Sequence, residues 1–152
     1  MAETMISGAE GAFADRSEAK HRVQSAPGYQ AYRILHAGFV AAPLLAGLDK
    51  FFHLLTNWDI YLAPRIAALS PIGGHGLMSV VGVVEVCAGV LVALRPRLGA
   101  YVVMAWLLAI ILNLLLIPGF FDIALRDFGL SLGALALGRL SAQYASGSGE
   151  SS

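Results

Sequence analysis

The sequence predicts an all-α fold: an integral membrane four-helix bundle, antiparallel and up-down, with a short interfacial helix between helices 1 and 2. Of its 152 residues, 57% are hydrophobic and only 13% are charged, whereas soluble domains carry about 25% charged residues. The apolar residues gather in four runs, each close to the ~20 residues that a helix needs to cross a bilayer. The runs do not alternate between apolar and polar residues, so helices are expected rather than the strands of a barrel.

The four expected helices cover about residues 32–55, 77–94, 98–117 and 121–140. Short proline-containing links join the second helix to the third and the third to the fourth. Helices joined by such links are antiparallel neighbours. The first link is longer and carries two aromatic residues, Trp58 and Tyr61. Their rings favour the headgroup zone, and the short interfacial helix is therefore expected there.

The two ends of the chain are polar. Residues 1–30 lack the apolar core of a secretory signal and are expected to form a disordered cytoplasmic tail, and residues 142–152 a flexible polar tail. The domain between them covers residues 31–141. With both ends on one side, that side holds seven cations (Arg16, Lys20, Arg22, Arg33, Arg95, Arg97 and Arg139) against three elsewhere (Lys50, Arg65 and Arg126). The excess predicts cytoplasmic termini in the inner membrane of the cell.

Polar side chains occur inside the expected spans, and all of them lie in the outer half of the membrane. From the helix rise, Lys50 and Asp127 lie about 8 Å and Glu85 about 12 Å below the outer surface. A charge at such depth costs ~2.5 kcal/mol or more unless it is paired, so these groups should turn inward. They predict a polar pocket that serves as a quinone or proton site, made of Asp49, Lys50, Glu85, Asn113, Asp122, Arg126 and Asp127.

Small residues should let the helices approach one another closely, and we assign this packing role to Gly82, Gly89, Gly129 and Gly133. Asp122 and Arg126 are four residues apart and should pair along their helix. A structural interpretation of the pocket stays open beside the functional one. The charges can simply neutralise each other and hold the helices in register.

The residues give little support for a haem, a metal site, dithiol chemistry or nucleic-acid binding. His36, His53 and His75 differ in depth, so a haem held between two of them is not expected. His53 and His75 can meet at the outer surface, but they lack a clear carboxylate partner, so no metal site is predicted. Trp106 is interpreted as a lipid-facing side chain. One cysteine excludes dithiol chemistry within the chain, and zero net charge gives no reason to expect nucleic acid as a partner.

Four stretches of this chain resemble the DoxX-like family of small four-helix membrane proteins: "AGLDKF", "GVVEVCAGVLVAL", "RPRLGAYVVMAWLLAI" and "ALRDFGLSLGALAL". The resemblance covers about residues 32–140. It implies an inner-membrane bundle with a link to redox chemistry, because founding members are small subunits of a thiosulfate:quinone oxidoreductase and others belong to oxidative-stress assemblies. The positions that match the family are Gly47, Lys50, Glu85, Gly89, Arg126 and Asp127.

The expected function is that of an accessory subunit of a quinone-linked redox complex. Lys50 or Arg126 would donate a hydrogen bond to the quinone, and Glu85 would exchange a proton with it. No redox centre is evident in the sequence, so the chain is not expected to be an enzyme alone, no catalytic residue is assigned, and electrons would come from a partner membrane or redox protein. The alternatives are a non-catalytic assembly or scaffold protein and, less favoured, a small proton-coupled transporter acting as a homo-oligomer.

Overall fold

The computed structural model describes residues 26–144, and this part of the chain is helical throughout its regular structure, without a strand. Its elements are α2 (Pro27–Phe52), η1 (Trp58–Tyr61), α3 (Pro64–Leu69), α4 (Gly73–Leu94), α5 (Pro96–Leu115) and α6 (Phe121–Tyr144). The prediction of an all-α fold is confirmed. The predicted tails fall mostly in residues 1–25 and 145–152, which lie outside the described residues.

Proline sets the start of three helices. Pro27, Pro64 and Pro96 each stand in the first turn of their helix, where the missing N–H costs no hydrogen bond and the fixed φ suits the helix. As a result α2 begins within the segment expected to be a disordered tail. The same helix ends earlier than predicted, because His53 adopts a left-handed conformation with φ 53° and donates its N–H to the Asp49 carbonyl at 2.6 Å.

Three helices in the described part of the chain are long and apolar enough to cross a membrane: α2, α4 and α5, with mean hydropathy of 1.4, 2.4 and 2.3. Their outward faces suit lipid, since large apolar side chains such as Leu45 and Leu112 are 63% and 66% exposed. Helix α6 has 24 residues but carries two aspartates and two arginines, which keep it out of this set. The findings therefore support a membrane protein with three apolar helices.

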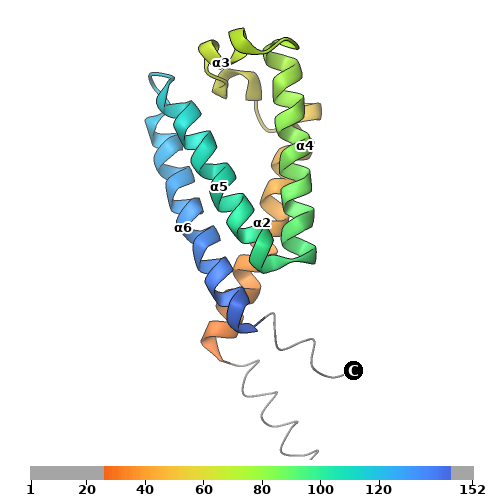
Figure 1. Ribbon diagram of the computed structural model, residues 1–152, viewed down its shortest axis with the longest axis vertical. Helices are drawn as coiled ribbons and strands as arrows, with labels where there is room; N and C mark the ends of the chain where they lie inside the picture. Colours follow the sequence, from red (N-terminus) through yellow and green to blue (C-terminus); the bar gives the residue numbers. More distant parts are fainter. Residues whose placement is uncertain (1–25, 145–152) are drawn as a thin grey trace, which may run out of the picture.

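The helices contact one another in pairs, α5 along α6 and α2 along α4 (Figure 1). Contacts of α4 with α5 and of α2 with α6 join the pairs. A core of small and apolar side chains fills the end near the turn at Arg95 and includes Val92, Ala100 and Leu137. From that turn α4 and α5 diverge toward the end where α3 lies (Figure 1). The packed core therefore lies at the end of the molecule away from α3.

Glycine allows α2 and α4 to meet backbone to backbone. A Cβ on Gly47 would lie 2.7 Å from the Gly82 carbonyl oxygen, and one on Gly82 would lie 2.8 Å from the Gly47 oxygen. On α6, a Cβ on Gly133 would lie 3.2 Å from the Phe39 ring, but one on Gly129 would meet no atom within 4 Å. Residues four apart lie on nearly the same face of a helix but about 6 Å apart along its axis, so the contact with Phe39 at Gly133 does not extend to Gly129.

Candidate functional site

A cavity of about 910 Å³ lies between the helices, with walls from α2, α4, α5 and α6 and a roof from η1 and the segment that follows it. Its size falls in the ~300–1,000 Å³ range of small-molecule sites, and most of its lining is apolar, as in such sites. The polar side chains that line it are Lys50, Thr56, Trp58, Tyr61, Glu85, Trp106, Asn113, Arg126 and Asp127. Five of the seven predicted pocket residues are therefore brought to one cavity, and Asp49 and Asp122 are not among them.

Lys50 and Glu85 form a buried ion pair between α2 and α4. The Lys50 Nζ donates to Glu85 Oε2 at 2.5 Å, and the two side chains are 3% and 10% exposed. The same Nζ lies 3.8 Å from the centre of the Trp58 ring, which adds a cation–π contact. The glycine contact described above, Gly47 with Gly82, lies one turn away and brings the two helices close enough for the pair to form. Each charge thus has a partner in a place where water is scarce.

Asp49 holds the chain after α2 instead of lining the cavity. Its carboxylate accepts the N–H groups of Leu54 and Leu55 and the indole N–H of Trp58, the last at 2.7 Å. The two backbone donors belong to the link after Phe52, where α2 has ended and no helical carbonyl accepts them. The prediction placed Asp49 in the pocket from its depth alone. Its actual effect on the cavity is indirect, because it places the Trp58 ring against Lys50.

Asn113 also serves as an anchor for the segment above the cavity. Its Oδ1 accepts the N–H of Ala63 at 3.0 Å, and its Nδ2 donates to the Tyr61 carbonyl at 2.6 Å. The amide thereby ties the junction of η1 and α3 to α5. It contributes to the cavity wall, but the hydrogen bonds it makes are with the protein backbone.

The charges of α6 pair differently from the prediction. Arg126 donates from Nε and Nη2 to Asp127 Oδ1, at 3.1 and 3.0 Å. The Asp127 side chain is 6% exposed and Arg126 is 64% exposed, so the guanidinium reaches in from the surface to a buried carboxylate. Asp122 is exposed in the first turn. Among the bonds of the described residues none joins it to Arg126, because the buried Asp127 carboxylate has the greater need of a cation.

Trp106 is a cavity residue that the sequence analysis assigned to lipid. Its indole lies close enough to the Glu85 carboxylate to interact with it, yet the buried Nε1 meets no acceptor at hydrogen-bond geometry within the described chain. A sequence signal existed. Gly99, Trp106 and Asn113 are spaced seven apart, which places them on one face of the helix, and the polar Asn113 marks that face as inward.

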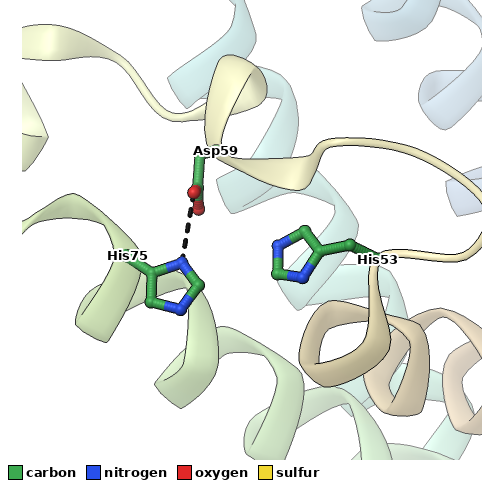
Figure 2. A group of neighbouring side chains, drawn as sticks. All are labelled: His53, Asp59 and His75. Carbon is green, nitrogen blue, oxygen red and sulfur yellow. Dashed lines mark hydrogen bonds and ion pairs between the residues drawn. The ribbon is translucent and has the colours of Figure 1, made fainter.

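A second group of polar side chains lies at the end of the molecule where α3 sits. His53 at the end of α2, Asp59 in η1 and His75 in the first turn of α4 point toward one another (Figure 2). His75 Nδ1 lies 3.2 Å from Asp59 Oδ2, and the two imidazole rings stack with centroids 5.5 Å apart. The meeting of the histidines was considered from the sequence. Asp59 supplies the carboxylate that the sequence analysis did not find, because the tight turn from His53 to η1 carries it back over the start of α4.

The arrangement can bind a ligand that has an apolar body and a hydrogen-bonding head. The cavity offers apolar walls, an indole donor beside the Glu85 carboxylate and an ion pair of zero net charge. These groups can bind a polar head and exchange a proton with it. Comparisons of the chain with models of known protein families, with curated proteins and with solved structures found no match.

Proposed function

We propose that this chain is a four-span inner-membrane protein of the DoxX-like type, an antiparallel up-down bundle with both termini in the cytoplasm and with α6 as the fourth span. Helix α6 has the length to cross, and it packs along α5 and contacts α2. Its buried Asp127 is paired with Arg126 and turned toward protein, which lowers the cost of placing α6 in lipid. The seven cations counted above support the cytoplasmic assignment of the end that carries Arg95 and Arg97.

The cavity, in this proposal, binds the head group of a quinone, and the chain acts as an accessory subunit of a membrane redox complex. The observation that carries it is the buried indole N–H of Trp106, which lies beside the Glu85 carboxylate without a well-formed hydrogen bond, in a cavity of about 910 Å³. Buried donors are almost always satisfied, and a quinone carbonyl is an acceptor. The apolar walls would hold the prenyl chain, and the Lys50–Glu85 pair beside Trp106 would supply or take the proton that accompanies reduction. The partner protein supplies the electrons.

Binding of a short-chain ubiquinone to the purified full-length protein in lipid nanodiscs tests this function. We expect Trp106→Phe, which keeps an aromatic though smaller side chain and removes the N–H, to weaken binding roughly tenfold, which corresponds to ~1.4 kcal/mol. Tyr101→Phe is the matched control. Tyr101 lies on the same helix, does not line the cavity and packs against Gly138. Wild-type protein without measurable binding, or equal binding by Trp106→Phe, would overturn the proposal.

A scaffold function is the second candidate, and the Lys50–Glu85 pair favours it. The two charges satisfy each other at 2.5 Å, as charges do when they only hold two helices in register. Glu85→Gln in cells with the native partners separates the two functions. A scaffold loses assembled complex while the activity of each remaining complex is unchanged, whereas a proton-exchanging subunit loses activity per complex.

A further inference from the structure

We propose that His53, Asp59 and His75 form a binding site for a divalent transition-metal ion, with Zn²⁺ the best-fitting ion, at the end of the molecule where α2 ends and α4 begins. The site is separate from the cavity, whose lining includes none of the three residues, and it does not depend on the quinone proposal. The three side chains converge from three different parts of the chain (Figure 2).

The distances are close to those of a bound ion. One ligand atom from each residue can be chosen so that all three lie within 4.8 Å of one another. Around a tetrahedral Zn²⁺ with bonds of about 2.0–2.1 Å, neighbouring ligand atoms lie about 3.3 Å apart. The pair His75 Nδ1 and Asp59 Oδ2 already has this separation, at 3.2 Å. Only His53 has to approach, by roughly 1.5 Å, which a side-chain rotation at the end of a helix can supply.

The ligand set selects the class of ion. Two imidazole nitrogens and one carboxylate oxygen suit Zn²⁺ and its transition-metal neighbours, whereas Mg²⁺ and Ca²⁺ prefer sites built of oxygen. Three protein ligands leave a fourth position for water. The aspartate also compensates part of the charge of the ion. At this end of the molecule the two helix dipoles oppose each other, since α2 presents its C-terminus and α4 its N-terminus.

Two polar groups of the cluster lack hydrogen-bond partners among the described residues and are therefore available to coordinate an ion. The Asp59 Oδ1 is buried and has no hydrogen-bond partner within the described chain, and the His53 ring makes no hydrogen bond to another described residue, only the stack on His75. His53 is also held in a left-handed conformation that non-glycine residues seldom adopt. The Asp49 carbonyl accepts the N–H of His53, and the Asp49 carboxylate accepts that of Leu54, so the backbone at His53 is fixed and only its side chain has to rotate toward an ion.

Zn²⁺ titration of the purified, untagged full-length chain in detergent tests the site, after the protein has been stripped with a chelator. A chromogenic chelator serves as competitor, and Co²⁺ reports tetrahedral coordination through its visible absorption. We expect one Zn²⁺ per chain. His53→Asn, Asp59→Asn and His75→Gln should each weaken binding more than about tenfold, because even residues that only orient a ligand cost 10–100-fold. Asparagine is chosen at His53 because it tolerates the left-handed conformation.

His36→Gln is the matched control, since His36 lies on α2 far from the cluster and bonds to the Val92 carbonyl. It should bind Zn²⁺ like the wild type, and circular dichroism should show equal helix content in all variants. Wild-type protein that yields all of its Zn²⁺ to the competitor overturns the proposal. So do wild-type affinity in the three cluster variants and an equal loss in His36→Gln.

Discussion

At the residue scale, Lys50 and Glu85 stabilise each other, because both charges are buried and each neutralises the other. We predict that Lys50→Met or Glu85→Met alone lowers the free energy of unfolding by about 3–5 kcal/mol, since each leaves an unpaired buried charge. The double variant should lose much less than the sum of the two. Reversible unfolding in mixed micelles measures the cycle, and strictly additive losses would show that the two charges do not interact.

Asp49 stabilises a turn, and its contribution should be measurable separately from that of the cavity. Asp49→Ala leaves two backbone N–H groups and the Trp58 indole without their acceptor. We expect unfolding to become easier by about 1–3 kcal/mol, seen as a lower thermal midpoint. Asp122→Asn is the control, because that aspartate is exposed in the first turn of α6 and its loss should change the midpoint little. Equal midpoints for the two variants would refute the role given to Asp49.

At the scale of single elements, the close contact of α2 with α4 depends on glycines, of which Gly47 and Gly82 face each other. In Gly82→Ala the new methyl group would lie 2.8 Å from the Gly47 carbonyl oxygen, so the helices must separate. We predict a loss of about 1–3 kcal/mol from this overpacking, measured by thermal unfolding.

Gly129→Ala makes the same chemical change in α6 where nothing lies within 4 Å. Alanine favours a helix over glycine by about 0.5–1 kcal/mol, so this variant should be neutral or slightly more stable. If both substitutions have the same effect, backbone approach is not what the glycine at position 82 provides.

The bounds of the elements were largely predictable, and the differences have local causes. Apolar runs place α4 and α5 within a few residues of their observed ends, because hydropathy directly measures what a spanning helix requires. Helix α2 differs more. Proline at its first turn starts it early, and the left-handed His53 ends it early. Neither effect is visible in hydropathy.

For the whole molecule, the proposed topology predicts which ends are accessible from outside the cell. After Cys87→Ser, single cysteines at Leu69 and Arg97 can be labelled in intact cells with a membrane-impermeant maleimide. Leu69 in α3 is 84% exposed and should react, whereas Arg97 at the start of α5 should react only after permeabilisation. Labelling of the cysteine at position 97 in intact cells, with the cysteine at position 69 unlabelled, would contradict the proposed orientation.

From the sequence alone it follows that the chain is helical and has apolar runs of membrane-spanning length, and the prediction that the polar residues within these runs turn away from lipid follows as well. Composition, run length and depth along a helix suffice for these conclusions, since they depend only on hydropathy and on the rise per residue. Depth could not tell how each polar group would be used. Asp49 and Lys50 are adjacent in sequence, yet one accepts hydrogen bonds at a helix end and the other crosses to Glu85.

Which side chains meet follows from the packing of the helices. It turned Trp106 into the cavity, paired Arg126 with Asp127 instead of Asp122, and brought Asp59 to the two histidines. Each outcome depends on the rotation of a helix about its axis or on the path of a short link. These are set by packing between elements distant in sequence, such as the contact of Gly47 with Gly82. Periodicity within one segment indicates an inward face, as it does for Trp106, but not which side chains meet there.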